Sequence, residues 1–308
     1  MPSYKQILVI INPKAGQRRA ERVRRTIEKY LDERQFNFTL RETQKATDAE
    51  AWGRSARAEG FDLLVVAGGD GTIREACEGL MRSRSRIPLA QIPTGTGNIT
   101  ARALRIPTLD TRKALDLIST GRVLDFDIGY LPNHDRYFTF VAGAGYDAAL
   151  IHDATRELKK ALGFFAYVAT GIKHFFTVRP VHMTLEIDDE IRHTKAHTIM
   201  AINIGTIANI QWSIAPNIDP HDGRLNIVLM SSRNLLGSLI VLFKIITKRY
   251  HGFSALQHFQ AKRLRVTTDP PLPFQFDGEP LGTTPFLVEV IPRAMPFVVP
   301  IDYVVPID

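Results

Sequence analysis

Residues 61–81, FDLLVVAGGDGTIREACEGLM, are the stretch of sequence that decides the fold. The apolar run over residues 63–67 has the length and the β-branched content of a strand buried on both faces, and it ends at two glycines. The apolar residues after the glycines recur at helical spacing, namely Ile73, Ala76, Cys77, Leu80 and Met81. The pattern therefore predicts a strand, a glycine-rich turn over residues 68–72, and a helix.

The turn over residues 68–72 is suited to a phosphate group. Glycine allows a positive φ and removes the Cβ that would keep an anion away, and the N–H groups at a helix start carry partial positive charge. Asp70 is unusual there, because a carboxylate repels phosphate unless it holds a metal ion or accepts a proton from an attacking hydroxyl. A plain tight turn with Asp70 as a helix cap explains these five residues equally well, so other stretches must decide.

Length and composition indicate a globular protein of two domains. The chain has 308 residues, more than one hydrophobic core usually serves, and its hydrophobic content is 44%. The single cysteine, Cys77, cannot form an internal disulfide, which favours a reducing, cytoplasmic compartment. The first apolar run, residues 7–11, is short and ends at Asn-Pro, so we expect no signal peptide.

The net charge of +7 comes from the first part of the chain, where residues 1–124 carry 22 Lys and Arg against 14 Asp and Glu. Such an excess suits a polyphosphate ligand, an anionic membrane surface or nucleic acid. We expect no nucleic acid partner, because no recognisable binding module is present. For most of the individual cations a solvated helix face is the simpler interpretation, and this applies to Arg18, Arg19, Arg22, Arg24, Arg25 and Lys29.

Strands and helices alternate over the first 124 residues. Strands are expected over residues 6–12, 36–43, 63–67 and 87–92, with a helix from 48 to 59 among those between them. This alternation predicts a parallel sheet with helices on both faces, an α/β domain over residues 1–124. Three of the four strands end in turns suited to phosphate, at residues 12–16, 68–72 and 93–98, and ligands bind at the carboxyl ends of such strands.

Past residue 124 the pattern changes to short alternating strands, which predicts a β-rich second domain over residues 125–293. The strand candidates are residues 137–142, 181–188, 191–204, 225–230, 263–268, 273–277 and 286–291, with Asp188-Asp189 as a hairpin turn. We expect residues 294–308 to pack back on the first domain, with 297–305 as an edge strand. Residues 158–176 and 235–250 are apolar but too short, or too broken by charge, to span a bilayer; they are either core helices or helices that touch a membrane interface or a lipid chain.

Four motifs, in order along nearly the whole chain, support a family resemblance. They are Asn12-Pro13-Lys14-Ala15-Gly16, Gly68-Gly69-Asp70-Gly71-Thr72, Pro93-Thr94-Gly95-Thr96-Gly97-Asn98 and Phe276-Asp277-Gly278-Glu279. Together they resemble the diacylglycerol kinase catalytic-domain family, which includes bacterial soluble lipid kinases, sphingosine kinases and ceramide kinase. The resemblance implies a Rossmann-like nucleotide-binding domain followed by a β-sandwich domain, with ATP and a lipid hydroxyl meeting in the cleft between them.

The activity implied by the resemblance is that of a lipid kinase that uses ATP and Mg²⁺. Its partners would be a lipid substrate and, transiently, an anionic membrane surface, so the protein would be cytoplasmic and peripheral at the membrane. A homodimer is left open.

The resemblance also implies roles for individual residues. The backbone of Gly68, Gly69, Asp70, Gly71 and Thr72 would hold the phosphates, and the nucleotide site would be lined by Asn12, Thr43, Thr96 and Asn98. Glu279 corresponds to the proton acceptor proposed in bacterial members, whereas Asp70 fills the role proposed for the base in sphingosine kinases. One of these carboxylates could deprotonate the lipid hydroxyl while the other orients magnesium.

Four further acidic positions, in three segments of the chain, match family segments. The loop IDPHDGRL, residues 218–225, resembles a structural magnesium loop, whose ligands here would be Asp219, Asp222 and the backbone carbonyl of Arg224. Asp147 lies where sphingosine kinases contact the lipid head, and Asp127 where the family has an acidic residue near the magnesium network. As bare residues they read as turn or surface carboxylates.

The sequence departs from the family pattern at one position, and three alternative functions remain. Many bacterial diacylglycerol kinases have Asp where this chain has Ile99, which puts diacylglycerol itself in doubt and keeps a sphingoid or ceramide substrate open. NAD kinases and 6-phosphofructokinases share the Gly-Gly-Asp-Gly turn, but residues 93–98 fit lipid kinases better. A non-catalytic nucleotide or lipid-binding protein is the alternative outside the enzymes, and retention of Asp70 and Glu279 argues against it.

Overall fold

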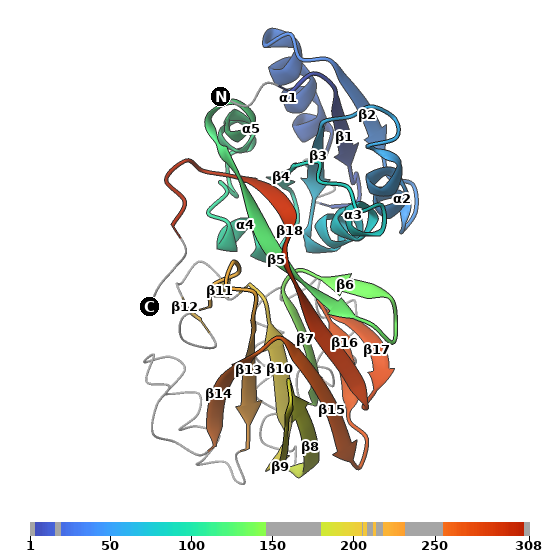
Figure 1. Ribbon diagram of the computed structural model, residues 1–308. Helices are drawn as coiled ribbons and strands as arrows, with labels where there is room; N and C mark the ends of the chain where they lie inside the picture. Colours follow the sequence, from blue (N-terminus) through green and yellow to red (C-terminus); the bar gives the residue numbers. More distant parts are fainter. Residues whose placement is uncertain are drawn as a thin grey trace. The chain divides into compact units, whose positions relative to one another are not determined.

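The structure, a computed structural model, describes residues 4–15, 20–145, 180–204, 206–207, 212–213, 218–231 and 255–304. The chain divides into two compact units. Unit 1 contains residues 1–128 and 292–305, and unit 2 contains residues 129–291 (Figure 1). Two strands, β5 (Arg122–Leu131) and β18 (Phe286–Val299), run from one unit into the other.

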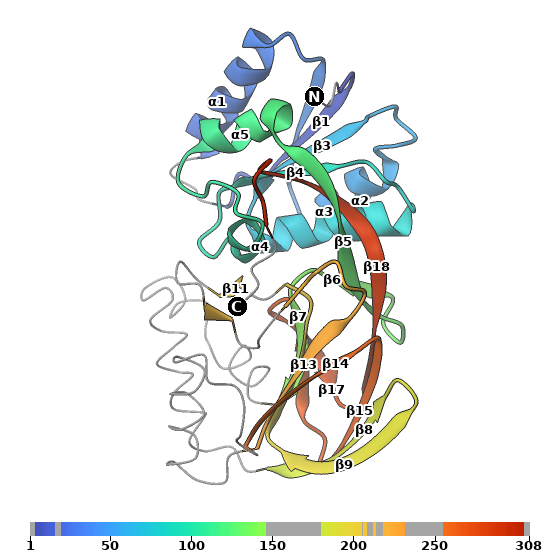
Figure 2. The ribbon, with the colours of Figure 1, turned by 60° about the vertical axis from the view of Figure 1, so that its left-hand side comes forward.

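Unit 1 is an α/β domain with a parallel sheet at its centre. Its strands are β1 (Ile7–Ile11), β2 (Phe38–Glu42), β3 (Leu63–Gly68) and β4 (Leu89–Pro93), paired in the order β2-β1-β3-β4. Its helices are α1 (Ala20–Glu33), α2 (Asp48–Ser55), α3 (Asp70–Arg82), α4 (Ile99–Ala103) and α5 (Thr111–Thr120). Helices α1 and α5 cover one face of the sheet, and α2 and α3 cover the other (Figure 2). Every residue of β1, β3 and β4 is buried, as expected for strands covered on both faces.

Two glycines bring α2 and α3 unusually close together. A Cβ added to Gly79 of α3 would lie 2.1 Å from the Glu50 carbonyl oxygen, and one added to Gly53 of α2 would lie 2.7 Å from the Ala76 carbonyl oxygen. The two helices therefore pack backbone against backbone. This contact fixes the body of α3, the helix that starts at the Gly-Gly-Asp-Gly stretch.

Unit 2 is an antiparallel β-sandwich. One sheet has the order β14-β13-β10-β7-β16-β17, and β18-β15-β8-β9 are paired opposite it. Apolar residues of both sheets fill one core, for example Ile199, Ile227 and Phe274 of the first and Leu185 and Val266 of the second. The strands are β6 (Arg136–Phe138), β7 (Val141–Gly145), β8 (Val181–Ile187), β9 (Glu190–Ala196), β10 (Thr198–Ile202), β11 (Thr206–Ile207), β12 (Trp212–Ser213), β13 (Leu225–Met230), β14 (Leu256–Ala261), β15 (Arg263–Asp269), β16 (Pro273–Phe276) and β17 (Glu279–Thr283). The predicted fold class, a Rossmann-like α/β domain followed by a β-sandwich domain, is confirmed.

Several element boundaries differ from the predictions. The expected strand over residues 191–204 is two strands, β9 and β10, separated at the buried His197. The last strand does not form a sheet edge, because β18 is a single strand of 14 residues that has β4 on one side and β15 on the other and also pairs with β5. The apolar segments 158–176 and 235–250 lie outside the described residues. Among the described helices, none is long and apolar enough to cross a membrane.

Candidate active site

The loops that follow β1, β3 and β4 meet at the carboxyl ends of these neighbouring strands. Asn12, directly after β1, donates from Nδ2 to Thr72 Oγ1 at 2.9 Å. Thr94, directly after β4, donates its N–H to the Gly68 carbonyl oxygen at 3.1 Å. The convergence expected from the three motifs is therefore present within unit 1, although Gly16 at the end of the first motif lies outside the described residues.

The loops after β3 and β4 touch through two glycines. A Cβ added to Gly95 would lie 2.6 Å from Gly69 Cα, and one added to Gly69 would lie 3.3 Å from Gly95 Cα. Any larger residue at position 95 would force the loops apart. The contact leaves backbone, rather than side chains, at the start of α3.

Helix α3 begins earlier than expected. The predicted turn over residues 68–72 is wrong in its second half, because Gly69 is the N-cap and Asp70, Gly71 and Thr72 form the first turn of the helix. The N–H groups of Thr72 and Ile73 bond to the Gly69 carbonyl oxygen at 3.0 and 3.1 Å. The N–H groups of Asp70 and Gly71 precede any backbone acceptor within the helix. The N–H of Asp70 bonds to its own carboxylate, and the N–H of Gly71 has the arrangement that binds anions.

Asp70 is turned toward the loop after β4. Its Oδ1 accepts the N–H of Thr100 at 3.1 Å, and its Oδ2 would lie 3.0 Å from a Cβ on Gly97. Burial raises the pKa of Asp70 above its usual value, while hydrogen bonds from backbone N–H groups at the start of α4 act in the opposite direction. Asp70 thus caps the short helix α4, thirty residues away in sequence, and joins the two glycine-rich loops.

The predicted nucleotide-lining residues have different environments. Asn98 is buried with φ of 49°, and its side chain accepts from Gly95 N and donates to Gly95 O, at 3.0 and 2.8 Å. Thr96, which lies between Gly95 and Asn98 in the sequence, is exposed. Thr43 is buried directly after β2, where its N–H bonds to the carbonyl oxygen of Ile11, the last residue of β1. The structure therefore brings together Asn12, Thr72 and the backbone of the loops, with Asn98 as a brace for the third loop.

Two polar residues of β4 and its loop were not among the predicted site residues. The Thr94 hydroxyl is buried and has no hydrogen-bond partner, and the same holds for both polar atoms of the Gln91 amide. Buried polar groups normally have partners, often an ordered water or a ligand. Thr94 lies in the loop next to Gly95, so its hydroxyl is available to an anion held there, and a cradle lined by backbone N–H groups and such a hydroxyl fits phosphate chemically.

Glu279 belongs to unit 2 and is the first residue of β17. Its side chain is 47% exposed, and its Oε2 lies 3.9 Å from a terminal nitrogen of Arg136. The preceding residue pair, Asp277-Gly278, forms the turn between β16 and β17. The Glu279 side chain is therefore about half accessible to solvent and paired with an arginine, and its role as proton acceptor stays a prediction.

The proposed structural-magnesium loop uses its carboxylates for its own backbone. Asp219 Oδ1 accepts the N–H of His221 at 2.9 Å, and Asp222 Oδ1 accepts the N–H of Arg224 at 2.8 Å. Gln260 also donates to Asp222 Oδ2 at 2.9 Å. In the part of the chain that the structure describes, no three His, Cys, Asp or Glu side chains form a metal-ligating group. The set Asp219, Asp222 and Arg224 carbonyl contains only two such side chains and stays a prediction.

Asp127 is fully buried in β5, where its Oδ1 accepts the N–H of Arg293 at 2.7 Å. The geometry gives Asp127 a contact within unit 1, and its assignment as a substrate residue stays a prediction. Asp147, the other predicted substrate residue, lies outside the described residues.

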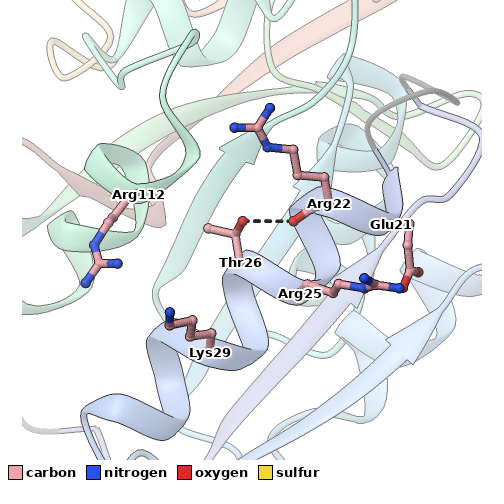
Figure 3. Close-up of a pocket in the computed structure, with 6 residues that line it drawn as sticks. All are labelled: Glu21, Arg22, Arg25, Thr26, Lys29 and Arg112. Atoms are coloured by element: carbon pink, nitrogen blue, oxygen red, sulfur yellow. Dashed lines mark hydrogen bonds and ion pairs between the residues drawn. The ribbon is translucent and has the colours of Figure 1, made fainter.

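A hollow of about 440 Å³ on the surface of unit 1 contains none of the predicted site residues. It is lined by α1 and by Arg112 of α5, and the long side chains of Arg22, Lys29 and Arg112 border it (Figure 3). Arg25 pairs with Glu21 at 2.8 Å, while Lys29 and Arg112 each pair with Glu33, at 3.8 and 3.1 Å. Three of its four cations are therefore paired with glutamates on a solvated helix face, which agrees with the simpler interpretation of these residues.

Comparisons with known proteins agree with this geometry. A family model described as "Diacylglycerol kinase catalytic domain" matches residues 6–131, and one described as "YegS C-terminal NAD kinase beta sandwich-like domain" matches residues 140–299. Diacylglycerol kinase of Bacillus subtilis is 27% identical over 281 residues, 91% of this chain and 92% of the relative. Diacylglycerol kinase of Staphylococcus saprophyticus is 28% identical over 284 residues, with 91% of each chain covered.

A solved structure extends this similarity to three dimensions. A Bacillus anthracis protein provisionally assigned as a diacylglycerol kinase superposes with a TM-score of 0.83 at 25% identity, covering 97% of this chain and 96% of the other. The two family models together span both units in the expected order. From its glycine-rich loops to its β-sandwich, this chain belongs to the diacylglycerol kinase catalytic-domain family.

Proposed function

We propose that this protein is an ATP-dependent lipid kinase that transfers the γ-phosphate of ATP to a hydroxyl of diacylglycerol or a similar lipid. The observation that carries the proposal is the glycine-to-glycine contact of Gly69 and Gly95 at the start of α3. Side chains are excluded there, and N–H groups at the helix start remain to bind phosphate oxygens. A capped turn alone would not need a second glycine loop pressed against it.

Within this proposal the residues of unit 1 bind and orient the nucleotide. The N–H group of Gly71 and the Thr94 hydroxyl would face the phosphates. Asn12 holds Thr72 and so fixes the first turn of α3 against β1. Such fixed donors act mainly by positioning and charge stabilisation, which supply most of the catalysis in phosphoryl transfer.

Glu279 is the better candidate for the proton acceptor. Its side chain is about half exposed and lies beside Arg136, whereas burial shields the Asp70 carboxylate, which accepts the N–H of Thr100. Asp70 then serves to hold the loops and to contact the metal ion that accompanies ATP. Magnesium, when bound, would neutralise charge on the transferred phosphate.

The lipid acceptor is the finer part of the proposal. The relatives named diacylglycerol kinase favour diacylglycerol, while Ile99 in place of the acid found in many bacterial members keeps sphingoid lipids and ceramide as alternatives. An NAD kinase-like activity is the small-molecule alternative. The β-sandwich family model, described as NAD kinase-like, is the observation that keeps it in view.

The test is to incubate the protein with Mg²⁺, ATP labelled on the γ-phosphate, and separately diacylglycerol, monoacylglycerol, sphingosine, ceramide or NAD. We expect label in one lipid class, lost on chelation of the metal and in Glu279→Gln. Label in NAD alone would replace the lipid kinase with an NAD kinase. No label in any acceptor, with ATP still bound, would favour a non-catalytic nucleotide-binding protein.

A further inference from the structure

The turn that precedes Glu279 has an unusual backbone. Asp277 and Gly278 connect β16 to β17 and have φ values of 43° and 84°. Two consecutive positive φ values match the tight hairpin turn for which Asp-Gly is a preferred pair. Phe276 and Glu279 are paired across this turn in the strand register, so the backbone conformation of Asp277 determines the position of Glu279.

The Asp277 carboxylate is bound by one short segment of chain. Its Oδ2 accepts from Thr139 N at 2.7 Å and from Thr139 Oγ1 at 3.0 Å. Its Oδ1 accepts from Phe140 N and Val141 N, both at 2.9 Å, and the Asp277 N–H donates to the Val141 carbonyl oxygen at 2.8 Å. Three consecutive backbone N–H groups that converge on an anion form a nest. Only a side chain whose two oxygens both accept hydrogen bonds, such as a carboxylate, can satisfy all of these donors.

The segment that holds Asp277 is itself held from its other side. Asn203, which is fully buried, donates from Nδ2 to the Thr139 carbonyl oxygen at 3.0 Å, and its own N–H bonds to the Phe140 carbonyl oxygen at 2.9 Å. Residues 139–141 are therefore fixed between Asn203 and Asp277. A turn anchored to such a platform has little freedom to shift.

The same stretch of chain also carries the cation beside Glu279. Arg136 lies three residues before Thr139, 3.9 Å from Glu279 Oε2, and its guanidinium sits 5.6 Å from the centre of the Phe276 ring. The Asp277 nest therefore joins the turn that leads into Glu279 to the segment that follows β6, the strand that begins with Arg136. Losing the nest would loosen the placement of Glu279 relative to this arginine.

We propose that Asp277 is a positioning residue for Glu279: its carboxylate, bound in the nest of residues 139–141, holds the Asp277-Gly278 turn so that Glu279 stands beside Arg136 in the geometry for accepting the proton of the lipid hydroxyl. This inference rests on the proposed function, because the proton acceptor is part of it. Asp277 itself contacts neither ATP nor the lipid, and it acts through Glu279.

The variant that tests the inference is Asp277→Asn. The amide can still accept from Phe140 and Val141, but its NH₂ group then faces the Thr139 N–H, donor against donor. We expect kcat to fall by roughly 10- to 100-fold, while KM for ATP and for the lipid changes by less than about 2-fold. Thr139→Val removes only the hydroxyl bond and should lower kcat by about 3-fold or less.

A double variant separates positioning from general damage. If Asp277 acts only through Glu279, then Asp277→Asn combined with Glu279→Gln should have the kcat of Glu279→Gln alone, within about 3-fold. The matched control is Asp188→Asn in the β8–β9 turn of the same unit, where Asp188 also has positive φ and accepts the N–H groups of Lys262 and Arg263 at 2.9 and 2.8 Å. It should lower stability and leave kcat unchanged.

Three outcomes overturn the inference. They are multiplicative losses in the double variant, a kcat loss in Asp188→Asn equal to that in Asp277→Asn, and wild-type kcat in folded Asp277→Asn. If Asp277→Asn does not fold, Gly278→Ala, which strains the same turn at φ 84° and meets no atom within 4 Å, gives the comparison in the wild-type and Glu279→Gln backgrounds. If the wild-type protein phosphorylates no lipid, the proposed function fails, and amide hydrogen exchange still tests the anchor. The Thr139 N–H, which loses its acceptor, should exchange at least 10-fold faster in Asp277→Asn, and unchanged protection of this amide would refute the anchor.

Discussion

The contact between Gly69 and Gly95 makes a quantitative prediction for Gly95→Ala. The new Cβ would lie 2.6 Å from Gly69 Cα, whereas carbon atoms in contact rest at about 3.5 Å, so the loops after β3 and β4 must separate by about 0.9 Å. The obstacle is backbone and cannot rotate away. Overpacking of this kind costs about 1–3 kcal/mol, and a displacement of about 1 Å beside reacting groups costs about 100-fold in rate. We expect lower stability and a fall in kcat/KM for ATP of about 100-fold.

Two other glycines serve as controls. Gly53→Ala places a Cβ 2.7 Å from the Ala76 carbonyl oxygen, a comparable clash between α2 and α3, and should reduce the melting temperature without changing KM for ATP. Gly71→Ala meets no atom within 4 Å, and in the first turn of α3 it should stabilise the free protein by about 0.5–1 kcal/mol. The same substitution should raise KM for ATP, because the methyl group enters the space in front of the helix N–H groups.

The assays are thermal unfolding without nucleotide and steady-state kinetics at varied ATP. Opposite signs of the stability change in Gly95→Ala and Gly71→Ala, with weaker ATP use in both, would support a phosphate cradle at this point. Wild-type kinetics in a folded Gly95→Ala would refute the role of the glycine contact. An unchanged KM in Gly71→Ala would place the phosphates elsewhere.

Three further predictions follow from single contacts. Burial of His197 lowers its pKa from 6.5 to about 4, so the unfolded chain binds the proton more readily than the folded chain. The contribution of His197 to the free energy of unfolding should be complete above pH 6.5, and the free energy should fall by about 3 kcal/mol as the pH drops to 4. Urea titrations should show a weaker pH dependence of the free energy of unfolding in His197→Gln. Asp110 caps α5 by accepting the N–H groups of Arg112 and Lys113, so Asp110→Ala should lower the free energy of unfolding by about 1 kcal/mol without affecting phosphorylation. A loss of activity in this variant would contradict a purely structural role for Asp110. Vesicle binding should rise with the anionic lipid fraction and weaken with salt, and indifference to both would remove the anionic membrane surface as a partner.

The parts of the fold that could be predicted are those coded by local patterns. Buried strands such as β1 and β3 are continuous apolar runs, and α1 buries Val23, Ile27, Tyr30 and Leu31 at the helical spacing visible in the sequence. Helix α5 was missed although Asp110 caps it and Ala114, Leu115 and Ile118 form its buried face. The union of residues 286–299 in one strand depends on partners at both ends, β15 and β4, which no local pattern contains.

For the candidate site, sequence could identify the loops but not their contacts. Asp70 is as compatible with a base or a metal ligand as with a cap, and only the folded chain places the N–H of Thr100 against it. In the sequence Gly95 is indistinguishable from an ordinary turn glycine, and only the structure shows its close contact with Gly69. The nest around Asp277 likewise joins residues about 138 positions apart, a separation beyond any motif.

The way in which β18 completes unit 1 has a consequence for synthesis on the ribosome. Phe297 pairs with Leu89 of β4 and packs edge-on against Phe126, and Phe297, Val298 and Val299 are buried. Residues 1–128 emerge from the exit tunnel long before residues 292–305, with all of unit 2 translated in between. During that interval the β4 edge and the cavity for Phe297 are open, and an open strand edge is a site for association between nascent chains. Unit 1 can therefore close only after unit 2 has been translated and residues 292–305 have emerged.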